Sequence, residues 1–93
     1  LLGLNPFTST ASSAVITVLE PSHGRSTSDT VRFRNVSSFD GFTSTILEKA
    51  VGYSITKVND DTYTFSASSG TATTGSIKGG GGRVTAGPVT LGT

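Results

Sequence analysis

Alternation of apolar and polar residues is the clearest pattern along this chain, and it predicts short β-strands. In residues 30–34, Val31 and Phe33 alternate with three polar residues, which is the two-residue period of a strand with one buried face. Residues 14–19 form an apolar, largely β-branched run that stops at a proline, Pro21. This run predicts a second strand, and a connection of about ten residues joins the two.

A tight hairpin is predicted in the middle of the chain. Residues 53–58 and 62–67 read as strands, and they flank Asn59-Asp60-Asp61, residue types that tolerate left-handed turn geometry. The residues that we expect on the inward face of these strands are Tyr53, Ile55, Tyr63, Phe65 and Ala67.

One short helical turn is predicted at residues 44–50. Ser44 or Thr45 could cap it, and Glu48, three residues after Thr45, would complete a capping box. Gly52 would end the helix. The fold class that follows is all-β, a small antiparallel β-barrel or sandwich of about five to six short strands with one short helical turn.

The chain is expected to form one domain with four segments. Residues 1–13 read as an extended N-terminal arm, and residues 14–67 as the β-barrel core. Residues 68–82 are rich in Ser, Thr and Gly, a composition typical of a flexible loop. Deletion of residues 76–82 should therefore leave the isolated fold intact but impair assembly with neighbouring subunits. Residues 83–93 would add one or two C-terminal strands and a tail.

Composition limits what stabilises so small a domain. The chain has 93 residues, one histidine and no cysteine, so disulfides are excluded and metal ligands are few. Seven basic and six acidic residues are interspersed, which gives no nucleic-acid footprint, and no apolar run is long enough to span a membrane. A domain of this size is marginally stable alone, so packing into an assembly would stabilise its fold.

The single histidine lies in the stretch His23-Gly24-Arg25-Ser26-Thr27-Ser28-Asp29, beside hydroxyl and carboxylate side chains. A nucleophilic site needs a base held against the hydroxyl by a third group, and neighbours along one loop rarely achieve that. We therefore interpret the stretch as a turn in which Gly24 adopts a positive φ and Asp29 bonds backbone amides before a strand.

Two other motifs are also better explained as structure than as chemistry. In a phosphate loop the glycines come first, Gly-Lys-Ser/Thr closes the loop, and a helix follows. In Lys78-Gly79-Gly80-Gly81-Gly82-Arg83 the lysine precedes the glycines, and no helix is predicted after them. Asp60 and Asp61 at a hairpin tip are typical solvated turn residues rather than a calcium site. No catalytic, cofactor-binding or metal-binding residue is predicted.

Some residues are candidates for contact with a partner. Three phenylalanines lie in predicted connections and are freer than the strand aromatics to meet another molecule. Two arginines share the outward face of the strand at residues 30–34, where they would be solvated or meet a neighbouring subunit or a DNA backbone; a DNA contact is possible but not indicated. The candidate partner contacts are Phe7, Arg32, Arg34, Phe39, Phe42, Lys78 and Arg83.

Three blocks and a glycine stretch follow one another in a recognisable order. The first block is Asn5-Pro6-Phe7-Thr8; the second contains His23, Gly24, Ser26, Asp29, Val31 and Phe33; the third contains Tyr53, Ile55, Thr56, Val58, Asp60, Thr62, Tyr63, Thr64 and Phe65; Gly79 to Gly82 close the series. With these residues the chain resembles a recurrent β-module of tailed-bacteriophage structural proteins. That module is similar to the small barrel of the first catalytic-cysteine half-domain of ubiquitin-activating enzymes. Ser28 departs from the pattern, which has Gly before the Asp, and without cysteine no ubiquitin-activating chemistry is implied.

The resemblance implies a non-enzymatic structural component of a virion, located in the tail, the neck or nozzle, or the head decoration. Its partners would be other virion proteins and copies of itself in a symmetric assembly, with no membrane. The alternative is a surface-displayed binding or adhesion module for a host glycan or protein, for which Phe39 and Phe42 would have to form an exposed aromatic pair.

Overall fold

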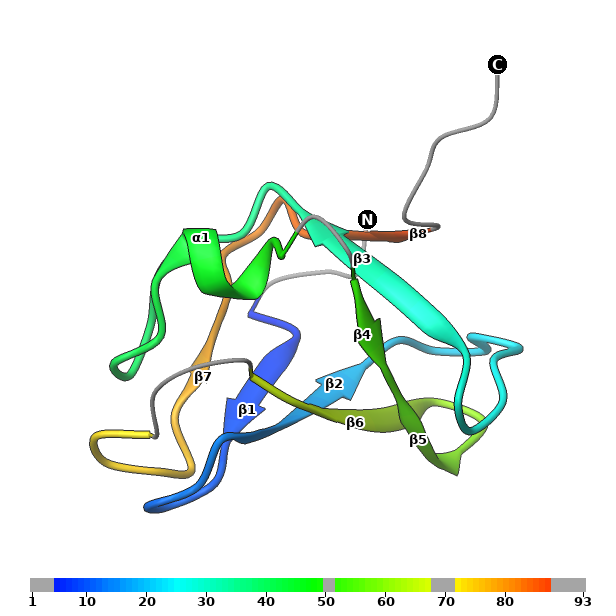
Figure 1. The fold of residues 1–93 in the computed structure, drawn as a ribbon, viewed down its shortest axis with the longest axis horizontal. Coiled ribbons are helices and arrows are strands. Elements are labelled where there is room, and N and C mark those ends of the chain that lie inside the picture. The colour runs from blue at the N-terminus through cyan, green and yellow to red at the C-terminus, as the bar shows by residue number, and fades with distance from the viewer. Residues whose placement is uncertain (1–4, 50–51, 68–71, 88–93) are drawn as a thin grey trace.

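The structure, a computed structural model, describes residues 5–49, 52–67 and 72–87 and confirms the all-β class. Within these residues two antiparallel sheets, one of five strands and one of three, face each other across the core and do not close into a barrel. In the view of Figure 1, β1, β2 and β6 lie in the lower half and β3 and β8 in the upper half. The elements are β1 (Phe7–Ser9), β2 (Val15–Leu19), β3 (Thr30–Arg34), α1 (Ser44–Leu47), β4 (Tyr53–Ser54), β5 (Thr56–Asn59), β6 (Thr62–Ser66), β7 (Lys78–Gly79) and β8 (Thr85–Gly87).

The five-stranded sheet has the order β5-β6-β2-β1-β7, so the apolar strand β2 is its middle strand. Ile16 and Val18 of β2 are buried, and the three residues that alternate with them are not, as the period predicted. The three-stranded sheet has the order β4-β3-β8, with Val31 and Phe33 of β3 fully buried. Both predicted strands are therefore confirmed.

Apolar side chains from both sheets meet in one core. Phe7 and Phe33 pack edge to face with ring centroids 5.0 Å apart, and Phe65 lies 5.0 Å from Phe33. The largest side chains buried there are Phe7, Ile16, Val18, Val31, Phe33, Phe42, Leu47, Ile55, Tyr63 and Val84.

The predicted hairpin forms, but its first strand is divided between the two sheets. β4 pairs with β3, whereas β5 pairs with β6 and carries a bulge between Lys57 and Asn59. Ile55 lies between them because its backbone is bound elsewhere: its N–H donates to Asp29 O, and its carbonyl accepts from Ser28 N. The expected inward residues Tyr53, Ile55, Tyr63, Phe65 and Ala67 are all buried, which confirms the predicted face.

The expectation of an extended arm at residues 1–13 is wrong for the part that the structure describes. β1 lies inside the five-stranded sheet and pairs with β2 on one side and β7 on the other. Pairing on both sides satisfies the backbone groups of Phe7–Ser9, and it places Phe7 in the core.

The glycine stretch is packed rather than loose, so the expected flexible loop at residues 68–82 is corrected for residues 72–82; residues 68–71 lie outside the described residues. Lys78–Gly79 is strand β7, and Gly79 and Gly80 are buried. A Cβ atom at Gly79 would lie 2.2 Å from the Phe39 ring, and one at Gly75 would lie 2.4 Å from the Ala11 backbone. These glycines allow close approach, which a composition typical of linkers does not reveal.

The helix is shorter than predicted and has a different cap. α1 spans Ser44–Leu47, and Thr43, not Ser44 or Thr45, is the N-cap, accepting at its Oγ1 from Ile46 N over 3.3 Å. Leu47 is fully buried and attaches the turn to the core. Gly52 lies beyond the helix with φ +73°, and its N–H donates to Lys49 O.

At the C-terminal end, Thr85–Gly87 is strand β8 and pairs with β3. The predicted strand at residues 89–91 lies outside the described residues. In the part of the chain that is described, no helix has the length and apolar character needed to cross a membrane.

Candidate functional site

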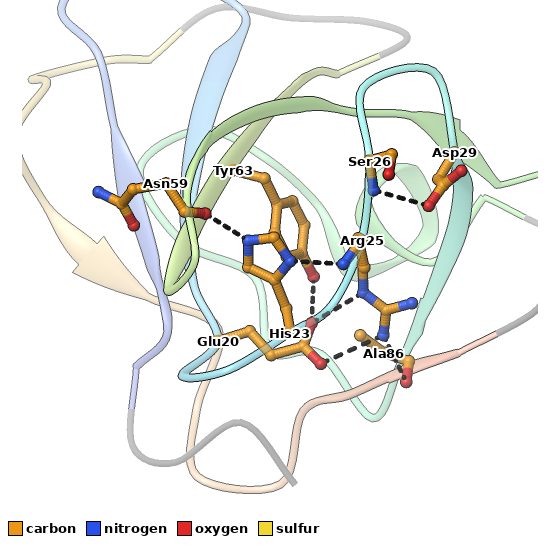
Figure 2. Close-up of polar contacts among 8 residues, drawn as sticks. All are labelled: Glu20, His23, Arg25, Ser26, Asp29, Asn59, Tyr63 and Ala86. Carbon is orange, nitrogen blue, oxygen red and sulfur yellow. Dashed lines mark hydrogen bonds and ion pairs between the residues drawn. The ribbon is translucent and has the colours of Figure 1, made fainter.

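A cluster of polar contacts forms where the β2–β3 connection meets β6 (Figure 2). β2 ends at Leu19, and the chain then reverses through Ser22 and Gly24, which have positive φ values of 54° and 64°. These turns bring His23 and Arg25 against Tyr63 of β6.

Both ring nitrogens of His23 are occupied by backbone groups. Nδ1 accepts from Arg25 N over 2.8 Å, so Nε2 carries the proton that is donated to Asn59 O over 2.7 Å. The ring also lies edge to face against Tyr63, with centroids 5.1 Å apart. His23 is therefore part of a turn that ties the β2–β3 connection to the β5–β6 hairpin, as the sequence predicted.

Glu20 connects this turn to the core. Its Oε1 accepts from Tyr63 OH over 2.6 Å and from Arg25 Nε over 3.1 Å, and its Oε2 accepts from Arg25 Nη2 over 3.2 Å. Burial, together with the hydrogen bond to Glu20, raises the pKa of the Tyr63 hydroxyl well above its usual value. Burial alone would lower the pKa of Arg25, but the contacts with Glu20 outweigh it and raise that pKa.

The contacts of this cluster join the β2–β3 connection to β6. The raised pKa keeps the Tyr63 hydroxyl neutral, and the Glu20 carboxylate forms an ion pair with Arg25. No pocket opens among the described residues, and those residues contain no cluster of three His, Asp or Glu side chains that could hold a metal ion.

The second half of the same connection is closed by Asp29. Its Oδ2 accepts from Ser26 N over 2.8 Å, and its own N–H donates to Ser26 O over 3.0 Å, which confirms the predicted bonding of an amide just before β3. Ser28, where the related pattern has Gly, has φ +77°. Serine therefore keeps the left-handed turn that glycine would adopt more easily.

Sequence reasoning missed a second polar cluster, built around Asp40. Its Oδ2 accepts from Ser9 Oγ over 2.5 Å and from Gly75 N over 2.9 Å, and its Oδ1 accepts from Thr74 N over 2.8 Å. The Ser9 hydroxyl bond, with the two amides, lowers the pKa of Asp40 below its ordinary value. Asp40-Gly41 was recognised only as a turn, because its partners are more than thirty residues away in both directions.

The predicted aromatic partner contacts are corrected by burial. Phe7 is 0% and Phe42 is 1% exposed, since one belongs to strand β1 and the other closes a turn over the core. Phe39 is half-buried and packs beside both rings, with centroids 6.1 Å from Phe7 and 5.9 Å from Phe42. The assumption that these residues lie free in connections is therefore wrong.

The four basic candidates are distributed over the molecule instead of forming one site. Arg32 and Arg34 are half-buried on the outward face of β3, where Arg32 Nε donates to Glu48 O over 3.3 Å. Lys78 is exposed on β7, at an edge of the other sheet, and Arg83 is exposed in the connection to β8.

No protein-family model, no curated protein and no solved structure matches this chain. The resemblance to the phage module therefore rests on the motif residues themselves, whose positions can now be described. Each of the following is buried, half-buried or hydrogen-bonded within the fold: Asn5, Phe7, His23, Asp29, Val31, Phe33, Tyr53, Ile55, Tyr63 and Phe65.

Proposed function

We propose that this chain is a non-enzymatic structural component of a tailed-bacteriophage virion, in the tail, the neck or nozzle, or the head decoration, and that it acts through contacts between subunits. The resemblance to the phage module suggests this role. The observation that carries the proposal is that ten of the motif residues, those named at the end of the preceding subsection, are buried, half-buried or hydrogen-bonded within the chain's own fold.

The polar motif residues illustrate this use. His23 binds Asn59 O and Arg25 N, and Asp29 binds Ser26 N. Asn5 accepts from Gly81 N at its Oδ1 and donates from its own N–H to Gly81 O. A pattern made of turn-forming and core residues specifies a rigid shape, which is what a repeating subunit contributes to a symmetric assembly.

The alternative of a glycan- or protein-binding adhesion module has lost its main support. It required Phe39 and Phe42 as an exposed aromatic pair, and Phe42 is 1% exposed. Stacking on a sugar ring needs an accessible aromatic face, so this pair does not form such a platform.

The test is the stoichiometry of the chain in purified particles, measured by quantitative mass spectrometry against the major head protein. We expect a fixed copy number that is a multiple of the rotational symmetry of one particle part. A non-virion protein from the same infected lysate serves as the control for contamination. Absence of the chain from particles, while it is abundant in the lysate, would contradict the proposal.

A further inference from the structure

The outward face of the five-stranded sheet is a row of β-branched hydroxyl side chains. Thr17 of β2 is paired with Thr8 on one side and Thr64 on the other, and the row continues to Thr56 and Lys78 at the two edges. The threonine face consists of Thr8, Val15, Thr17, Leu19, Thr56, Thr62, Thr64, Ser66 and Lys78.

The threonine face is almost uncharged and rigid. Lys78, at the β7 edge, is the only charged residue among those that define it. Leu19 is 53% exposed, although it lies on the middle strand of the sheet. β-Branched side chains on paired strands have few rotamers to lose, so ordering them in a contact costs little entropy.

We propose that the threonine face packs against the same face of a second copy of this chain, about a two-fold axis parallel to β2. This inference rests on the proposed role as a virion subunit and names one of its contacts. Because β2 is the middle strand, such an axis places β2 over β2 of the other copy and β6 over its β1. Two sheet faces in this arrangement pack like the layers of a β-sandwich.

Charge favours a second copy over a charged partner. The axis carries the β7 edge of each copy over the β5 edge of the other, so Lys78 does not meet Lys78. The β5 edge and the turn after it carry Lys57, Asp60 and Asp61, a net charge of −1; Asp60 is ion-paired with Lys57 over 3.4 Å, and Asp61 Oδ1 accepts from Ser22 N. The rest of the two faces brings no like charges together, whereas a charged partner would lose hydration without gaining a counter-charge.

The size of the face indicates a weak contact. The nineteen residues of the five strands, at a strand spacing of about 4.8 Å and a rise of about 3.3 Å per residue, give a face of roughly 300 Å². A stable interface buries about 800 Å² on each partner. Self-association should therefore be weak in dilute solution and become effective where other contacts in a ring hold the copies together.

Crosslinking tests both the face and the axis, and the absence of native cysteine makes single-cysteine variants specific. With a short bismaleimide and protein near ~1 mM, where weak contacts are populated, Thr17→Cys should crosslink to itself. Thr8→Cys and Thr64→Cys should crosslink to each other in a mixture about tenfold more than either does alone, since the axis places β6 over β1. Ser54→Cys, exposed on β4 of the other sheet, is the matched control.

A second variant separates contact from folding. Leu19→Lys places like charges against each other across the axis and should reduce Thr17→Cys crosslinking about tenfold. Thermal unfolding should stay unchanged because Leu19 is exposed. Crosslinking of Thr17→Cys no faster than Ser54→Cys, or of Thr8→Cys with itself as readily as with Thr64→Cys, would overturn the inference. Either result leaves the copy number in particles, which tests the proposed function, unaffected.

Discussion

Single residues in this chain hold backbone conformations that their side chains disfavour. Ser28 has φ +77°, and Ser22, Asn35 and Asp40 also lie in the left-handed region. For a residue with a Cβ atom this region costs about 1–2 kcal/mol. Asn and Asp reduce that cost by local hydrogen bonds, whereas the exposed Ser28 side chain faces solvent.

Replacing Ser28 by glycine is therefore expected to stabilise the protein. Relief of the left-handed strain exceeds the added freedom of the unfolded chain, and the net gain should be about 0.5–1 kcal/mol in the free energy of unfolding. Urea denaturation monitored by circular dichroism measures the change. Ser26→Gly, a neighbouring position outside the positive-φ region, is the control and should lose a few tenths of a kcal/mol. Equal losses in both variants would contradict the strain argument.

Glycine positions differ according to what surrounds them. Gly79→Ala would force a Cβ atom into the Phe39 ring and should destabilise the protein by about 3 kcal/mol. Gly24→Ala meets no atom within 4 Å, so only its φ of +64° opposes the methyl group and the loss should be about 1 kcal/mol. Thermal unfolding of the two variants, measured side by side, tests the difference; a larger loss at Gly24 would show that packing at Gly79 is loose.

At the scale of elements, one carboxylate fastens a connection to the sheet. Asp40 binds Ser9 of β1 and the amides of Thr74 and Gly75, and its carbonyl accepts from Thr73 N. The chain before β7 is thereby held against β1. These hydrogen bonds lower the pKa of Asp40, because each donor stabilises the charged carboxylate.

The contribution of Asp40 should depend on pH. Because its folded pKa is below the ordinary value of 3.8, the stabilisation is complete above that value and is lost as pH falls through the folded pKa. Asp40→Asn should unfold at lower urea concentration than the wild type at neutral pH. The gap should narrow as pH falls below 3.8 and the wild-type carboxyl becomes protonated. A gap that is constant with pH would assign the loss to steric effects instead of charge.

The helix cap distinguishes the observed element from the predicted one. Thr43→Ala removes the hydroxyl that accepts from Ile46 N and should lower the free energy of unfolding by about 1 kcal/mol. Thr45→Ala, the position that the capping-box pattern favoured, should change it by no more than about 0.5 kcal/mol, because Thr45 is exposed within the helix. Chemical denaturation of the two variants measures both values. A reversed order would restore the capping-box interpretation.

At the scale of the whole molecule, each sheet contains strands that are far apart in sequence. β7 pairs with β1, β8 pairs with β3, and the chain passes between sheets at Ile55. The stability of each sheet therefore depends on segments far apart in sequence, and the unfolding transition should be cooperative.

Deletion of residues 76–82 is the corresponding test. It removes β7 and the carbonyls that accept from Ser37 N and Asn5 N, so we expect loss of cooperative unfolding and of dispersed amide signals in NMR spectra. Gly24→Ala, which keeps every strand, provides the folded reference. A deletion variant with a wild-type melting transition would restore the interpretation of this segment as a flexible loop.

Sequence alone determined the features that depend on near neighbours. The alternation in β2, β3 and β6 fixed which side chains face the core, and Asp60-Asp61 placed the hairpin turn. The turn at His23 and Asp29 was also predictable, because its glycine and carboxylate act within a few residues. For the same reason the all-β class followed from the pattern.

Only the tertiary structure decided which segments form strands by pairing with distant strands, and which glycines are needed for close packing. Phe7–Ser9 is a strand because β2 and β7 pair with it, and Gly79 is buried because Phe39 lies against it. Asp40 acquired its role from Ser9 and Gly75, each more than thirty residues away. These outcomes depend on contacts between distant parts of the chain, and a local sequence pattern does not indicate which distant residues will be in contact with it.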